Sequence, residues 1–227
     1  MSGLDRPNLS DELYLARGSD VEAYRPIITG DIFQGLRVPG SEDDGGLAMV
    51  VAHPCSMRQG AHLKPHVQMA VVRNGPPIPL DRWDGNYGVM PLPELHRPGD
   101  LSPRAVFELA GRVPTDELLR HRRMACLSAK GILLLLQRMT FSMTRVVVDL
   151  DILLGSIDFV LEEVELLDEW MQGRLDTRNG NLEPAIHDEE RLFDDVMRSE
   201  IDGNSLRQHL RDPASRAKVR RSVRAAR

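Results

Sequence analysis

The fold is decided between Gly30 and Arg73, where three apolar runs are separated by polar turns: Gly30-Asp31-Ile32-Phe33, Ala48-Met49-Val50-Val51-Ala52 and Val67-Gln68-Met69-Ala70-Val71-Val72. Short apolar runs bounded by turn residues are typical of buried strands. The second run leads directly into the loop His53-Pro54-Cys55-Ser56-Met57-Arg58-Gln59-Gly60. We therefore predict three neighbouring strands, and we expect the segments around them to close the same unit.

Further strands and short helices extend this unit. Strand-like runs begin at Tyr24 and recur at 86–91 and 123–128, with turn residues between them. Ser102-Pro103 is a typical helix start and predicts a helix to about Arg112, while Ser128 predicts the N-cap of a helix over 129–139. The links between strands lack the long helical crossovers that parallel pairing needs. The sequence therefore predicts an α+β protein built on a small, partly open β-barrel with inserted short helices.

The chain divides into three predicted segments. Residues 1–24 are a polar lead-in whose Tyr14 and Tyr24 are candidates for the core, residues 25–142 are the barrel domain, and residues 143–227 are a helical extension. Within the extension, apolar periodicity predicts helices over 156–171 and 187–201, and Asp212-Pro213 predicts the start of a last helix to Ala226. Residues 144–149 fit either a strand or a helix start, and 176–184 are predicted to be a linker.

The net charge of −5 is unevenly distributed along the chain. Residues 149–202 hold 17 acidic and 4 basic side chains, a net of −13, whereas residues 204–227 hold 8 basic and 1 acidic side chain, a net of +7. Such a basic tail indicates nucleic-acid contact, docking on an acidic surface (that of another copy included), or a solvated helix end. The nucleic-acid interpretation selects Arg216, Arg220 and Arg221 as phosphate contacts.

The composition and the apolar segments indicate the cellular compartment of the protein. The chain has 227 residues, 41% of them hydrophobic, and only two cysteines, Cys55 and Cys126, which make no disulfide framework and suit a reducing cytoplasm. The N-terminus lacks the basic-then-apolar pattern of a secretion signal. The most apolar run, 131–136, is far shorter than the roughly 20 residues that cross a bilayer. We expect a cytoplasmic protein without a membrane segment.

Gly30-Asp31-Ile32, the connection after it and the strand Ala48-Met49-Val50-Val51 resemble the opening of the PemK/MazF family. Leu127-Ser128 and Leu136-Gln137-Arg138-Met139 resemble that family's closing strand and helix. The resemblance covers residues 25–142 and implies an SH3-like barrel. It also implies a toxin of a toxin–antitoxin module that cleaves RNA without a metal, and a homodimer.

The chain departs from the family at the residues that carry cleavage. Gly46-Leu47 stands where the family's second strand usually begins with Arg-Pro, and Val71-Val72-Arg73 stands where a Thr or Ser is usual. The loop that begins at His53 also replaces a simpler one. The resemblance therefore predicts the fold, whereas cleavage by the family's usual residues is not expected.

Other residues supply the groups that metal-independent RNA cleavage needs, which are a base, an acid and a cation. We predict Asp31, His53 and Arg58 as catalytic residues, with His62 as a further candidate, if they meet at one end of the barrel. Arg58, Lys64 and Arg73 are predicted to hold phosphates. The alternative is that Asp31 caps a turn and the histidines are ordinary surface residues.

The loop also permits two other kinds of chemistry. Cys55, His53, His62 and His66 lie within 14 positions, and cysteine and histidine are the usual ligands of structural zinc. Their spacing matches none of the usual zinc patterns, so our main hypothesis contains no metal and no cofactor. Alternatively, Cys55 could be a nucleophile with His53 or His62 as its base, or simply a small buried residue.

The leading functional hypothesis is therefore a PemK/MazF-like toxin relative that binds single-stranded RNA or cleaves it without a metal. The alternative is a non-catalytic nucleic-acid-binding or assembly subunit of a bacterial defence system, because the family arginine is absent and the extension is long. An antitoxin or another protein is an expected partner, and a homodimer is the expected assembly.

Overall fold

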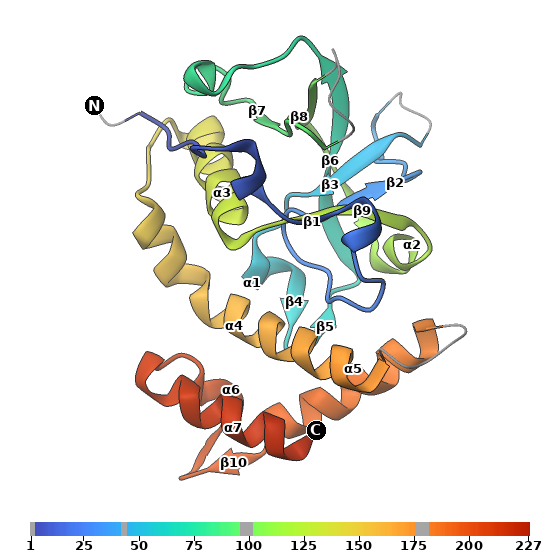
Figure 1. The fold of residues 1–227 in the computed structure, drawn as a ribbon, viewed down its shortest axis with the longest axis vertical. Helices are drawn as coiled ribbons and strands as arrows, with labels where there is room; N and C mark the ends of the chain where they lie inside the picture. Colours follow the sequence, from blue (N-terminus) through green and yellow to red (C-terminus); the bar gives the residue numbers. More distant parts are fainter. Residues whose placement is uncertain (1–2, 42–44, 96–101, 176–181) are drawn as a thin grey trace.

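The computed structural model describes residues 3–41, 45–95, 102–175 and 182–227. Within these residues the centre is a curled antiparallel sheet of seven strands in the order β1-β9-β2-β3-β6-β8-β7 (Figure 1). The strands are β1 (Tyr14–Arg17), β2 (Ile32–Gln34), β3 (Leu47–Val50), β6 (His66–Gly75), β7 (Val89–Pro91), β8 (Ser102–Pro114) and β9 (Arg122–Leu127). Together with the helices, this sheet confirms the predicted α+β class.

The apolar runs at 47–52 and 67–72 form neighbouring central strands, as predicted. Leu47 lies opposite Val72 and Met49 opposite Ala70, so β3 and β6 run antiparallel. Met49 belongs to one apolar cluster, whereas its neighbour Ala48 belongs to another on the opposite face of the sheet. Because both faces are covered, these strands are continuously apolar rather than alternating.

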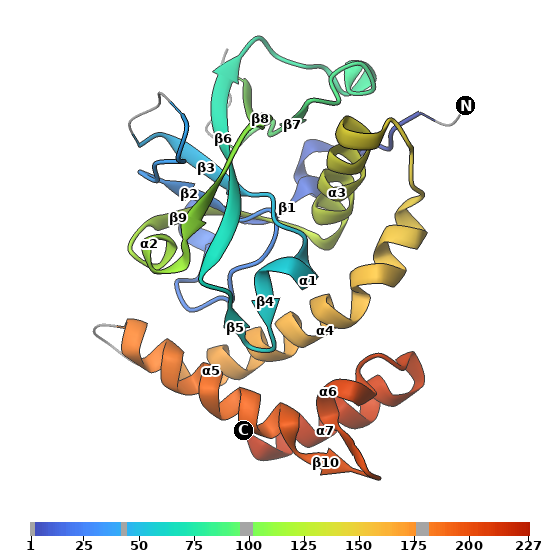
Figure 2. The same ribbon diagram turned by 180° about the vertical axis from the view of Figure 1, so that it is seen from behind.

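Different helices cover the two faces of the sheet (Figure 2). The first cluster packs against α3 (Ala129–Thr144) and the first half of α4 (Leu150–Leu175). The second cluster includes Leu118 of α2 (Thr115–Leu119) and Met57 of α1 (Pro54–Met57). The sheet therefore lies between α3 on one side and α2 on the other, whereas α1 lies below the sheet next to α4 (Figures 1 and 2).

The predicted helix at 102–112 is wrong, because residues 102–114 form the long strand β8. This strand pairs with β6 from Ser102 opposite Gly75 to Pro114 opposite His66, with a shift of register between Ala70 and Val71 that leaves residues 107–109 without partners in β6. Ser-Pro is a local helix-start signal, but long-range pairing with an apolar strand outweighs such local preferences. The prediction of a helix over 129–139 is confirmed by α3, which begins at the predicted cap, Ser128.

Part of the predicted lead-in belongs to the sheet. Residues 14–17 form the edge strand β1 and pair with β9. Leu13 is fully buried, and Tyr14 and Tyr24 are buried as predicted. The strand predicted at 86–91 is confirmed in its last three residues by β7.

The C-terminal part is helical, as predicted. The helix α4 contains the predicted 156–171 and is longer, α5 (Leu182–Arg198) contains most of 187–201, and α7 (Arg216–Ala226) is the predicted last helix. Residues 145–149 form neither a strand nor a helix. Residues 176–181 of the predicted linker lie outside the described residues, and 182–184 belong to α5.

A third apolar cluster holds the C-terminal helices together. Trp170 of α4, Phe193 of α5 and Val219 of α7 meet in it, and Leu206 of α6 (Leu206–His209) joins them. Figure 1 shows α4 running below the sheet, with α6 and α7 on its far side. None of the described helices has both the length and the apolar composition needed to cross a membrane.

The contact between α3 and the segment before β1 makes a testable prediction. A Cβ on Gly131 would collide with the backbone carbonyl oxygen of Leu13, whereas a Cβ on Gly155 of α4 would meet nothing. We expect Gly131→Ala to lower the free energy of unfolding by about 2 kcal/mol through overpacking. Gly155→Ala should raise it by about 0.5–1 kcal/mol, because alanine is the better helix former. Urea denaturation measures both, and equal effects would contradict the packing.

Candidate functional site

Asp31, predicted as catalytic, is a buried structural residue. Its side chain is 0% exposed, and one carboxylate oxygen accepts the backbone N–H of Ile28 at 3.1 Å and lies 3.0 Å from Nη1 of Arg123. The other oxygen lies 3.6 Å from Nη1 of Arg25. Gly30 before it has a φ of +88°, a conformation that glycine adopts without strain. Gly30-Asp31-Ile32 therefore sets the start of β2.

The predicted loop after β3 is also held by internal bonds. His53 caps the single turn of α1, because its Nδ1 accepts the backbone N–H of Cys55 at 3.3 Å. Partial burial lowers the pKa of His53. The buried guanidinium of Arg58 donates to the backbone carbonyls of Ile27, at 2.6 Å, and Ala61. Arg58 borders a cavity of about 240 Å³ that neither Asp31 nor His53 lines, so the three predicted catalytic residues do not share one site.

The other two interpretations of the loop find no support in the described residues. No group of three or more His, Cys, Asp or Glu side chains is placed to hold a metal ion in the described part of the chain, so Cys55, His53, His62 and His66 do not form a zinc site. Cys55 is exposed, its thiol faces the backbone carbonyl of Ser156 at 3.9 Å, and desolvation raises its pKa. A raised pKa disfavours the thiolate that a nucleophile requires.

The predicted phosphate-binding side chains are dispersed over the surface. Lys64 follows β5 (His62–Leu63) and is exposed, and Arg73 is exposed on β6 opposite Arg104. Arg221 is exposed on α7 and has no ion-pair partner among the described residues. These residues do not line one shared cavity.

The basic last helix docks on the acidic helix of its own chain. Arg216 pairs with Asp158 at 2.6 Å, Arg220 with Glu162 at 2.5 Å and Arg224 with Glu169 at 3.0 Å. The three arginines recur every four residues, and their partners advance along α4 in the same direction, so α7 runs parallel to α4. Between them Val219 and Val223 are buried in the third cluster. Docking on an acidic surface is thus what the structure shows, and these ion pairs occupy Arg216 and Arg220.

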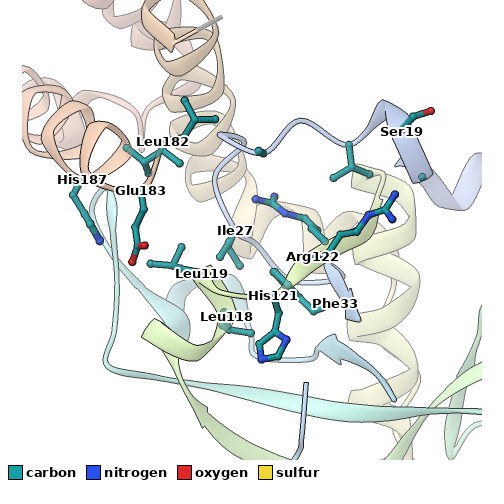
Figure 3. A pocket seen from close by; sticks show the side chains of 15 residues that line it. Ser19, Ile27, Phe33, Leu118, Leu119, His121, Arg122, Leu182, Glu183 and His187 are labelled. Atoms are coloured by element: carbon teal, nitrogen blue, oxygen red, sulfur yellow. The ribbon is translucent and has the colours of Figure 1, made fainter. Parts of the chain in front are cut away.

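A cavity of about 480 Å³ lies between the second apolar cluster of the sheet and α5. Figure 3 shows Leu182, Glu183 and His187 of α5 on one side, Arg122 and Ser19 on the other, and Leu118, Leu119 and His121 below. Its described lining is contributed by Gly18, Ser19, Val21, Ala23, Ile27, Phe33, Leu118, Leu119, His121, Arg122, Arg123, Leu182, Glu183, Ile186 and His187. The lining combines apolar side chains with a few charged groups, as is typical of ligand sites.

The basic wall of this cavity has unused hydrogen-bond donors. Arg122 is exposed and makes no ion pair with a described residue. The side chain of Arg123 next to it is 8% exposed, and its terminal nitrogens bind Asp31 and backbone carbonyls. Its Nε has no hydrogen-bond partner in the described structure, but that atom is buried. Sequence reasoning missed this wall. The available signal was the run Arg120-His121-Arg122-Arg123, of which only Arg123 belongs to the predicted strand at 123–128.

A second chamber of about 200 Å³ adjoins the cavity and shares Leu119, Ile186 and His187 with it. In its wall, Oε2 of Glu190 lies 3.6 Å from Nδ1 of His62 and 3.5 Å from Nδ1 of His187. Burial raises the pKa of Glu190, and the neighbouring Arg58 and the two histidines oppose that shift. The two chambers together combine an apolar lining, the exposed guanidinium of Arg122, and a carboxylate that faces two imidazoles.

Comparison with protein families, curated proteins and solved structures finds no match to this chain. The chemistry of the cavity is therefore the basis for a functional proposal. An unpaired guanidinium beside an apolar lining suits a ligand that carries both a phosphate and an apolar ring.

The helix–helix ion pairs predict a measurable coupling. In a double-mutant cycle, Arg220→Ala and Glu162→Ala should couple by about 0.5–1 kcal/mol in unfolding free energy, as partly exposed pairs do. About 1 M NaCl should remove most of this coupling by screening. Arg221→Ala is the matched control, since its side chain has no partner among the described residues. Coupling of the same size with Arg221→Ala would contradict the observed pairing.

Proposed function

We propose that this protein binds single-stranded RNA, and that the cavity between the sheet and α5 receives one nucleotide of it. Arg122 would hold a phosphate, and the apolar side would receive the base. The observation that carries the proposal is the exposed, unpaired guanidinium of Arg122 at the rim of this cavity. Phosphate contacts dominate the affinity of proteins for nucleic acids, and arginine matches phosphate geometry.

Three further features support this proposal. His121 precedes Arg122 and lines the same side of the cavity, where its imidazole adds a polar group beside the guanidinium. Arg123 in the same wall is held by Asp31, which leaves Arg122 as the arginine of this wall that is available to a ligand. The cavity is far larger than a water molecule, and it is lined by Ile27, Leu118 and Phe33, which belong to the second apolar cluster.

The proposal keeps the PemK/MazF-like interpretation in its RNA-binding form. The antiparallel order of β2, β3, β6 and β8 supports an SH3-like barrel, and two free cysteines support a cytoplasmic location. Cleavage by Asp31, His53 and Arg58 is not part of the proposal, because these residues are engaged in internal bonds and lie apart. Their substitution would test the stability of the protein rather than catalysis.

Fluorescence anisotropy with a labelled single-stranded RNA of mixed sequence tests the proposal. We expect Arg122→Ala to weaken binding by about tenfold at low salt, because it removes one charge-assisted contact. The slope of log affinity against log salt should fall by about 0.7, the value for one phosphate of a single strand. The variant should fold, since Arg122 is exposed.

Arg221→Ala is the matched control for this measurement. It removes the same charge from the exposed face of α7, which the sequence alone had suggested as a nucleic-acid contact. It should leave the affinity unchanged. If both variants lose the same amount of RNA affinity, the RNA contacts α7 as well and the cavity is not its specific site. If the wild type binds no RNA, the proposal is refuted.

A second candidate function is the assembly subunit, in which this chain associates with itself or with another protein such as an antitoxin. It is favoured by exposed apolar side chains where α3 turns into α4: Met143 is 75% exposed, Ile152 64% and Val146 56%. Clusters of exposed apolar residues mark interaction surfaces.

Sedimentation velocity tests whether this corner joins two copies. If the protein is a homodimer through this surface, Ile152→Glu should shift it to the monomer, because a charge would be buried in an apolar contact. Leu192→Glu, at an exposed position of α5 far from this corner, is the control and should leave the mass unchanged (Figure 1). An unaltered mass for Ile152→Glu would exclude this surface as the dimer contact.

A further inference from the structure

Three titratable side chains join the sheet to the C-terminal helices at the second chamber. His62 comes from β5, beside the sheet, whereas His187 and Glu190 come from α5. The same carboxylate oxygen of Glu190 faces Nδ1 of both imidazoles, at 3.6 and 3.5 Å. The Glu190 side chain is only 13% exposed, so its charge is weakly screened by water.

The charge of this cluster depends on pH. With both imidazoles neutral its formal charge is −1, and with both protonated it is +1. Histidine is the side chain whose charge ordinarily changes between pH 5 and 8. Ionic attraction between Glu190 and the imidazoles therefore exists only while the imidazoles carry protons.

Other charged groups face the cluster or the shared cavity. Arg58 of β4 (Arg58–Gln59) acts on Glu190 at every pH, because a guanidinium stays protonated. Across the cavity from α5 lie His121, Arg122 and Arg123, whereas Glu183 lies on α5 itself. Glu117 lies 4.0 Å from Nε2 of His121.

We propose that His62, Glu190 and His187 form a proton-operated contact that holds α5 against the sheet more tightly at mildly acidic pH. Because His187 lines both chambers, the same protons make the cavity more favourable to anions. This second consequence rests on the proposed function, whereas the contact itself does not.

The first experiment needs no ligand. The unfolding equilibrium constants of the wild type and Glu190→Gln are compared by urea denaturation of the full chain at pH 6 and pH 8.5. At each pH we divide the unfolding equilibrium constant of Glu190→Gln by that of the wild type. We expect this ratio to be about fivefold larger at pH 6 than at pH 8.5, because the substitution removes an ion pair that exists only at the lower pH. Equal ratios at the two pH values would overturn the proposal.

Two further variants test whether the pH dependence comes from this cluster. Glu108→Gln removes an exposed carboxylate of β8 that makes no ion pair with a described residue, and its ratio should be the same at both pH values. His187→Gln removes one of the two imidazoles at an exposed position, so it should reduce the gain in stability on acidification. It replaces Glu190→Gln as the test if that variant does not fold. A pH effect undiminished in His187→Gln would equally overturn the proposal.

The second experiment links the contact to the cavity. RNA affinity is measured at pH 6 and pH 8 for the wild type and His187→Gln, and we expect the wild type to gain about fivefold more on acidification. Equal gains would overturn the link to the cavity. If RNA binds at neither pH while the stability ratios still differ, the proposed function fails and the contact stands.

Discussion

The buried carboxylate of Asp31 is the constraint on which the rest of the structure depends. A fully buried charge is tolerated only when it is paired, and removal of a partner costs several kcal/mol. Asp31 meets this requirement with Arg123 of β9 and Arg25 of the preceding loop. Arg25 also lies 3.7 Å from Asp168 of α4, whose pKa is raised by burial. One carboxylate thus relates the loop before β2, the strand β9 and the C-terminal helices to each other.

The same network determines which arginine in the wall of the cavity is used by the fold and which one is available to a ligand. Successive residues of a strand point to opposite sides, so Arg123 enters the buried network while Arg122 stays at the surface. Burial, with a contribution from Asp31, raises the pKa of Cys126 on the same strand to about 12. This cysteine therefore stays protonated, and the reactive character of this region lies with arginine and histidine. On the side of the sheet, the wall of the cavity is therefore fixed by groups that pair with one another.

Local pattern predicted the parts of the fold that depend on local physics. The apolar runs around Met49 and Ala70, the Ser128 cap and the periodicity of α4 were enough to predict two strands and two helices. The strand at 102–114 was mistaken for a helix because its pairing with β6 is a long-range interaction that Ser102-Pro103 does not reveal. Charge sums predicted docking of the last helix as one alternative, but only the three-dimensional arrangement shows that α4 of the same chain receives it.

The candidate site was harder to predict than the fold. Asp31 and Arg58 were chosen because carboxylates and guanidinium groups can do chemistry, yet the same groups are suited to hold a fold together when they are buried. Their partners decide which role applies, and Arg123 is 92 positions from Asp31 in the chain. Glu190 illustrates the converse, since an acidic helix gave no reason to single it out. Its relation to His62 arises only when α5 packs beside β5.

The place of β9 in the sheet has a consequence for how the molecule folds. Residues 122–127 lie between β1 and β2, so the strand that joins these two is separated from both by a long stretch of chain. Closing such long loops costs chain entropy before any contact compensates for it, and chains with many distant contacts fold slowly. Before β9 is in place, β1 lacks its partner strand, and the edge of β2 that faces away from β3 is unpaired. Because β9 pairs with both strands across such long loops, we expect its pairing to contribute strongly to the time that the native state takes to form.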